Sequence, residues 1–178
     1  GYQGIADVAC RHQDEPLTTA IAHLPREPLT ALCHCLESRV PSAALAKALS
    51  DRLQQVLAEQ PADIPLLAAL VRSLSAGGSA DASFTQALHD ILRHPVGNNI
   101  EVLAAISGRA WEALSEPAFL DAYLQRLAEN DHGQTAFEHC IGDLLSLPAL
   151  ADTVRQALRS PGQSTEVKKA FATMTANT

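Results

Sequence analysis

The sequence has few aromatic residues, which make up only 4% of the chain although 47% of its residues are hydrophobic. The apolar content is therefore chiefly Leu, Ala, Val and Ile. Leu and Ala are strong helix formers, whereas β-strands favour aromatic and β-branched residues. The composition predicts an all-α protein.

Positive charge is scarce as well. The 178 residues include 13 Lys or Arg against 20 Asp or Glu, which gives a formal net charge of −7 and a pI near 5.4. A phosphate-binding surface normally needs clustered Lys and Arg, and single-stranded nucleic acid is usually stacked on aromatic side chains. We therefore expect no nucleic-acid partner.

Long apolar runs and a secretion signal are both missing. The longest pronounced run, IPLLAALV at 64–71, is far shorter than the roughly 20 residues that a membrane span needs. No basic start followed by an apolar stretch is present either. We expect a cytoplasmic protein with no membrane partner, in which the four cysteines are thiols.

Motifs for catalysis and cofactor binding are also lacking. The sequence contains no Walker loop, dinucleotide fingerprint, His-Glu metalloprotease pair or nucleophile elbow. We predict that the chain is not an enzyme, that it has no catalytic, cofactor-binding or metal-binding residues, and that it takes no cofactor. The only methionine is Met174, so we expect a processed start or a fragment of a longer protein.

Prolines and glycines divide the chain into segments of helical length. Pro41, Pro117 and Pro148 each open a run with apolar 3–4 spacing, and proline suits the first turn of a helix. The predicted helices span residues 2–12, 16–24, 28–39, 41–59, 63–75, 81–93, 99–114, 117–129, 134–147, 148–159 and 165–175.

Some of these segments resemble one another. IPLLAALVRSL from Ile64 aligns with IEVLAAISGRA from Ile100, 36 residues later. The segments that follow them also match at an offset of 35 residues. Their apolar positions are Phe84, Ala87, Leu88 and Leu92 in one segment and Phe119, Ala122, Tyr123 and Leu127 in the other. The same pattern occurs at Leu45, Ala48, Leu49 and Leu53, and more weakly at Leu150, Thr153, Val154 and Leu158.

A helix pair that recurs at this period is typical of a stacked α-solenoid, in which neighbours bury each other's apolar stripes. We predict one domain over residues 1–178, with N-terminal helices at 1–40 and stacked helix pairs at 41–178 in a right-handed, HEAT-like α-solenoid. The alternative is an irregular multi-helix bundle, because a shared Leu and Ala bias could also produce the match. We expect the alanine pairs at 68–69 and 104–105, with Gly108 and Gly142, to let helices approach closely.

The stretch TALCHCLESR places a histidine between two cysteines. On a helix, Cys33 and Cys35 point roughly 200° apart, so they cannot bind one metal ion together. Cys33 lies on the same apolar stripe as its neighbours, His34 points away and Cys35 is at the flank. The stripe consists of Leu29, Leu32, Leu36 and Val40. We interpret Cys33 as a small core residue. A site assembled from Cys10, His12 and Cys140 stays open, although no ligand spacing supports it.

A second candidate is the helix segment that carries His139, Cys140 and Asp143. His139 and Asp143 are four residues apart, which would allow a carboxylate-oriented imidazole beside a cysteine nucleophile. However, Cys140 follows the apolar stripe of Phe137 and Ile141, so we expect it to be buried and unreactive. The favoured interpretation is an exposed helix-face pair.

Three further features have a structural and a functional interpretation. The recurrent arginines could form a ladder for an acidic partner, but cations near helix C-termini also complement the helix dipole. They are Arg39, Arg72, Arg93, Arg126 and Arg159. Trp111 keeps the apolar phase of its segment and is expected in the core, although partial exposure would suggest a contact residue. HPVGNN could bind an anion, but Asn98 or Asn99 is more simply a helix N-cap.

Several stretches together resemble the C-terminal part of a bacterial family catalogued as domain of unknown function 3549. They are GYQGIADVACR, PLTALCHCLES, IEVLAAISGRAWEAL and AFLDAYLQRLAENDHGQTAFEHCIGDLLSLPAL. The resemblance covers nearly the whole chain. It implies that the chain is a fragment that has lost a separate N-terminal region. It carries no activity and no functional residues.

The leading hypothesis is a non-catalytic helical-repeat domain whose surface binds another protein or its own N-terminal region, since stacked repeats create extended concave surfaces. The alternative is an enzyme or small-ligand-binding domain, with a site in a helical groove or at the junction with a missing N-terminal region. A nucleic-acid-binding scaffold would require a concave basic face. The sequence leaves the oligomeric state open.

Overall fold

The computed structural model describes residues 1, 3–4, 15–77 and 82–176. Over these residues the chain is all-α, with helices and two short 3₁₀ segments and no strand. The α-helices are α2 (Glu15–Ile21), α3 (Arg26–Leu36), α4 (Ala43–Ala58), α5 (Ile64–Ser75), α6 (Ala82–Arg93), α7 (Ile100–Arg109), α8 (Pro117–Ala128), α9 (Gln134–Ser146), α10 (Ala151–Leu158) and α11 (Thr165–Ala176). The 3₁₀ segments are η1 (Pro95–Asn98) and η2 (Trp111–Ser115).

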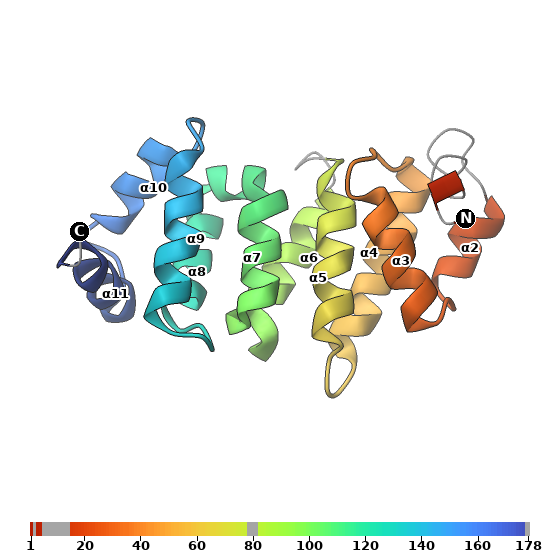
Figure 1. The fold of residues 1–178 in the computed structure, drawn as a ribbon, viewed down its shortest axis with the longest axis horizontal. Coiled ribbons are helices and arrows are strands. Elements are labelled where there is room, and N and C mark those ends of the chain that lie inside the picture. Colours follow the sequence, from red (N-terminus) through yellow and green to blue (C-terminus); the bar gives the residue numbers. More distant parts are fainter. Residues whose placement is uncertain (2, 5–14, 78–81, 177–178) are drawn as a thin grey trace.

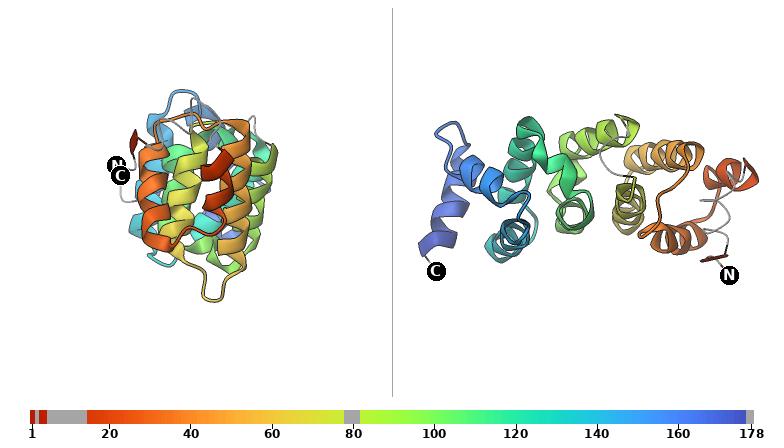
Figure 2. Two further views of the ribbon diagram at one scale, coloured as in Figure 1. Left: turned by 90° about the vertical axis from the view of Figure 1, so that its right-hand side faces the viewer. Right: turned by 90° about the horizontal axis from the view of Figure 1, so that it is seen from above.

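The helices lie in two layers along an elongated molecule, with the chain termini at opposite ends (Figure 1). One layer contains α3, α5, α7 and α9, and each of these helices packs against the next. The other contains α2, α4, α6, α8 and α10 in the same serial order, and α11 packs on α8 and α9 at the end. The row curves gently, with α3, α5, α7 and α9 on its inner side (Figure 2).

The central inner helix, α5, is almost completely enclosed. It packs against α3 and α7 within its layer and against α4 in the other layer. Eight of its residues are buried, and the paired alanines Ala68 and Ala69 have no exposed surface. Small side chains at these positions allow close helix packing, which confirms the expectation for this alanine pair. The matching pair differs, because Ala105 is buried and Ala104 is exposed.

The sequence offset identifies helices that are neighbours in the same layer. Ile64 and Ile100 begin α5 and α7, which lie side by side on the inner side. The large apolar residues of the second pattern are buried along α4, α6 and α8, and along α10 and at the N-cap that precedes it. They are Leu45, Leu49, Leu53, Phe84, Leu88, Leu92, Phe119, Tyr123, Leu127, Leu150, Val154 and Leu158. The second position of the pattern is not consistently buried, because Ala87 of α6 is buried whereas the matching Ala122 of α8 is exposed.

Several helix ends follow from side-chain caps. Ser42, Asp63 and Asn99 precede α4, α5 and α7, and each accepts a hydrogen bond from a backbone N–H of the first turn. The N-cap expected at Asn98 or Asn99 is thus Asn99. Pro117 occupies the first position of α8 as expected. Pro148 does not open a helix, because a turn separates it from α10.

Three other predictions were wrong, and one falls largely on residues that the structure does not describe. The helix predicted to end at residue 39 stops at Leu36, so Val40 leaves the apolar stripe and is 67% exposed. The helix predicted at 99–114 divides into α7 and η2. A Cβ atom on Gly108 or Gly142 would contact nothing, so neither glycine serves close packing. The helix predicted at 2–12 lies mostly outside the described residues.

The backbone at Gly97, in the 3₁₀ segment between α6 and α7, packs tightly against the backbone at the end of α6. A Cβ atom at this position would lie 2.6 Å from the Ile91 carbonyl oxygen and 3.0 Å from the Leu92 Cα. Only glycine fits such a contact without a shift of the backbone. The residue therefore allows the chain to turn tightly against the end of α6.

Candidate functional site

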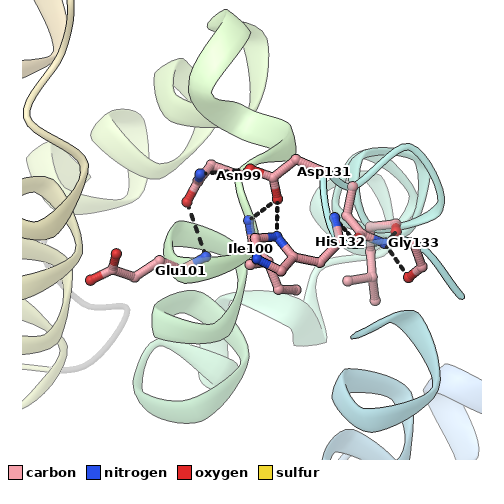
Figure 3. Close-up of polar contacts among 8 residues, drawn as sticks. Asn99, Ile100, Glu101, Asp131, His132 and Gly133 are labelled. Carbon is pink, nitrogen blue, oxygen red and sulfur yellow. Dashed lines mark hydrogen bonds and ion pairs between the residues drawn. The ribbon is translucent and has the colours of Figure 1, made fainter. Parts of the chain in front are cut away.

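The most connected polar cluster lies where the α8–α9 loop meets the start of α7 (Figure 3). The Asp131 carboxylate accepts hydrogen bonds from the Ile100 backbone N–H at 2.9 Å and from Asn99 Nδ2 at 2.8 Å. His132 Nδ1 lies 2.9 Å from the same carboxylate. Asn99 Oδ1 accepts the Glu101 N–H at 3.0 Å. Two side chains therefore cap α7, the local Asn99 and Asp131 from the α8–α9 loop.

Hydrogen bonding sets the protonation of Asp131. Partial burial alone would raise the pKa of this carboxyl, but the hydrogen bonds from His132 and from the Ile100 N–H lower it, and the resulting pKa is below the ordinary value of 3.8. The ionised carboxylate also interacts favourably with the helix dipole. It occupies the place that an external anion would take, so this helix start serves structure.

The α8–α9 loop is held in shape by Asn130. Its Nδ2 donates to the carbonyl oxygens of Leu127 at 2.7 Å and Gly133 at 3.0 Å, and its Oδ1 accepts the His132 N–H at 2.8 Å. Gly133 has a φ of 75°, which favours glycine. The Asp131 N–H also donates to the Asn98 carbonyl oxygen at 3.2 Å. The loop thus presents Asp131 to α7 in a fixed position.

Polar contacts of the same kind join other neighbouring elements. Arg26 at the start of α3 forms an ion pair of 2.6 Å with Asp63, the N-cap of α5. Gln54 on α4 donates to Asp90 on α6 at 3.1 Å. Arg126 on α8 donates through Nε to the Leu92 carbonyl oxygen at 2.6 Å and so caps the end of α6. These polar side chains therefore link neighbouring helices within each layer.

The Cys-His-Cys stretch lies where the sequence indicates. Cys33 is fully buried, Cys35 is half-buried and His34 is exposed. Burial raises the pKa of the Cys33 thiol to about 12, although a hydrogen bond with Ser73 partly opposes this effect. His34 pairs with Glu37 at 2.9 Å on the surface. Cys33 is thus a protonated core residue.

The described residues contain no group of three or more His, Cys, Asp or Glu side chains that could hold a metal ion. Two members of the open ligand set, Cys10 and His12, lie outside these residues. Cys140, the third member, is surrounded by core side chains of α7, α8 and α9 rather than by other ligands.

The structure does not assemble a nucleophile from His139, Cys140 and Asp143. Cys140 is only 6% exposed, whereas His139 and Asp143 are exposed and share no hydrogen bond in the described part of the chain. Burial raises the pKa of the Cys140 thiol, and hydrogen bonds with Ser107 and Tyr123 only partly offset this effect. The thiol stays protonated at neutral pH, which disfavours nucleophilic chemistry.

Several arginines make contacts within the chain. Arg93 pairs with Asp90 at 3.5 Å. Arg126 binds the end of a neighbouring helix rather than its own, a contact that sequence reasoning missed because the two segments are 34 residues apart.

Trp111 is half-buried and packs against the core from η2. It is therefore neither fully in the core nor a free contact residue.

Surface grooves lined by described residues are further candidates, including the following three. One, of about 490 Å³, is lined by Val40, Pro41, Ala43, Ala46, Lys47, Leu74, Gly77 and Ser83. A second, of about 380 Å³, runs between α3 and α5 on the inner side, beside Arg26, His34 and Pro65. The third lies beside α10 and consists of two adjoining hollows. No helix in the described part is long and apolar enough to cross a membrane.

The fold and its polar contacts define an all-α protein of two helical layers. The chain belongs to the family described as Protein of unknown function (DUF3549), whose model matches residues 1–175. The family has no assigned function. No match to the chain was found among curated proteins or solved structures.

Proposed function

We propose that the chain is a non-catalytic interaction domain that binds another protein, or a further region of its own polypeptide, through the surface of a right-handed HEAT-like α-solenoid. The observation that carries the proposal is the serial contact of helices within each of the two layers. Such an array has no single centre at which reactive groups could converge, and its inner side offers an extended surface.

The use of polar side chains supports the non-catalytic part of this proposal. Asp131, Arg126 and Asp63 are engaged in joining neighbouring helices. The thiols of Cys33 and Cys140 are protonated and buried. We keep the cytoplasm as the proposed compartment, because the cysteines of the described part are free. We propose no cofactor and no nucleic acid or membrane partner.

A photo-crosslinking experiment in the native cell tests the interaction. A photoreactive amino acid replaces an exposed residue on an inner helix, Ala104 or His139, or on an outer helix, Gln86 or Ala122. We expect positions on one surface to crosslink to the same protein, and positions on the opposite surface to give no such product. The absence of a defined product from every position would overturn the proposal.

A further inference from the structure

The C-terminal end differs in charge from the rest of the chain. Residues 151–178 contain four Lys or Arg against two Asp or Glu, whereas residues 1–150 contain nine against eighteen. The acidic sequence thus contains a short basic segment at 151–178. Such an asymmetry favours partners of opposite charge at that end.

Within this region, α10 presents a polar face that no other helix of its layer covers. α4, α6 and α8 each contact a helix on both sides within the outer layer, whereas α10 contacts only α8 in that layer and packs otherwise on α9 and α11, among the described residues. Ala151, Val154 and Leu158 are buried on one side of α10. The opposite side exposes Asp152, Arg155, Gln156 and Arg159.

This face forms one wall of a groove, here called the α10 groove, made of two adjoining hollows of about 250 and 550 Å³. Both hollows are lined by Gln156 and Ser160. The smaller one includes the apolar side chains of Pro117, Leu120 and Ala157. The groove therefore combines an apolar part, which also contains Asp121, with the polar face of α10, which carries Arg155 and Arg159 against Asp152.

Two cations, Arg155 and Arg159, line the larger hollow. A third, Lys168, donates to the carbonyl oxygen of Pro161, another residue of this lining, at 2.7 Å. The only acid in its lining is Asp152, which pairs with Arg155 at 2.8 Å but is itself 99% exposed. Arg159 has no hydrogen-bond or ion-pair partner among the described residues. A guanidinium in this state is free to bind a carboxylate through two parallel hydrogen bonds.

We propose that the α10 groove binds an acidic segment of a protein partner, a peptide whose Asp and Glu carboxylates meet Arg155 and Arg159 and whose apolar side chains enter the hollow beside Leu120. This inference rests on the proposed interaction function and assigns it a surface and a ligand chemistry. Opposite charge steers the segment to the groove and fixes its orientation.

Fluorescence anisotropy with the whole chain tests the proposal. The probe is a short labelled peptide of Asp, Glu and Leu, and its counterpart carries Asn and Gln in place of the acids. The variant is Arg155→Glu/Arg159→Glu. The matched control is Lys47→Glu/Arg93→Glu, which makes the same change in net charge at exposed cations of α4 and α6. Circular dichroism and thermal unfolding check that each variant folds.

We expect the acidic peptide to bind more tightly than its uncharged counterpart. The α10 variant should weaken binding at least about tenfold and the control less than about twofold. Equal losses in both variants, or equal binding of both peptides, would overturn the proposal. So would self-association that the α10 variant abolishes, because the occupant would then be a second copy of the chain. If the acidic peptide does not bind but photo-crosslinks form at other surfaces, the proposal for the α10 groove is wrong and the proposed interaction function stands.

Discussion

At the scale of single residues, the buried thiols make the clearest prediction. Burial raises the pKa of Cys33 to about 12 and also raises that of Cys140, whereas Cys35 is half-buried. We expect Cys33 and Cys140 to resist alkylation at pH 8 in the folded protein and Cys35 to react faster, because the thiolate is the nucleophile. Mass spectrometry with and without denaturant measures this. Rapid labelling of Cys33 in the folded state would contradict the prediction.

The tight turn at Gly97 leads to a second prediction. Gly97→Ala should lower the free energy of unfolding by about 1–3 kcal/mol, because the added Cβ would press on the backbone of Ile91 and Leu92. The matched control is Gly142→Ala, on a helix with open space, which should raise stability by about 0.5–1 kcal/mol. Urea unfolding measures both. Similar effects of the two substitutions would exclude steric contact as the cause.

The lowered pKa of Asp131 predicts a pH-dependent contribution to stability. A carboxyl whose pKa is lower in the folded than in the unfolded state stabilises the protein fully above the unfolded pKa, and loses this contribution as the pH falls through the folded pKa. Asp131→Ala should cost about 0.5–2 kcal/mol at pH 7, as for a lost N-cap. The difference from wild type should narrow below about pH 4.

Asp152→Asn is the control for this pH dependence, because the Asp152 side chain is almost completely exposed. It should change stability little at any pH. Unfolding curves for the three proteins between neutral and acidic pH make the comparison. A deficit of Asp131→Ala that stays constant over the whole range would show that the carboxylate charge contributes nothing.

Local residue patterns predicted part of this chemistry. The helical phase of Cys33 and Cys140 indicated their burial, and the asparagine before Ile100 indicated a cap. The sequence could not show that Asp131 also binds the Ile100 N–H, because the two residues are 31 positions apart and meet only when α9 packs beside α7. Contacts that depend on packing leave no local pattern in the sequence.

At the scale of helices, the prolines show what local rules can predict. Pro117 opens α8, whereas α10 starts only at Ala151, three residues after Pro148, because Leu147 and Leu150 close a turn with their backbone groups. The same limit applies to Val40, which has the right spacing for an apolar stripe but lies beyond the end of α3. Apolar spacing predicts helices well and their ends less well.

The contact between α8 and the end of α6 gives a prediction at this scale. Arg126→Ala should lower the free energy of unfolding by about 1.5–3 kcal/mol, because Arg126 Nε and Nη2 donate to the carbonyl oxygens of Leu92 and Arg93 at the end of α6. Arg126→Lys keeps the charge but loses the planar fork, so it should restore only part of the stability.

Hydrogen exchange locates the effect of Arg126. We expect Arg126→Ala to reduce protection at the C-terminal end of α6 more than in α3, which has no contact with Arg126. Exposed Arg93, whose side chain pairs with Asp90 alone among the described residues, provides the control Arg93→Ala, whose effect should be within about 0.5 kcal/mol. Equal effects of Arg93→Ala and Arg126→Ala would mean that the cap contributes nothing specific.

At the scale of the whole molecule, the offset between Ile64 and Ile100 predicted which helices would be neighbours in a layer. It did not predict the curvature of the row, which depends on how successive helices pack. Nor did it predict the cover that α11 provides on α8 and α9, because α11 lies outside the repeated segments. The sequence did not predict the candidate surface grooves either. The α10 groove lies beside the last described helix of the outer layer, an arrangement that no single sequence segment reveals.

The serial arrangement of the helices predicts which of them should lose hydrogen-exchange protection when one part of the row is destabilised. Leu103 is buried in α7 near the centre, and Leu158 is buried in α10 near the end. Each Leu→Ala substitution should cost about 2–5 kcal/mol locally. In a row whose helices contact mainly their neighbours, Leu158→Ala should reduce hydrogen-exchange protection in α10 and α11 but leave α3 and α5 protected. Leu103→Ala should reduce protection throughout. Equal loss in α3 and α10 from Leu158→Ala would instead indicate one cooperative core.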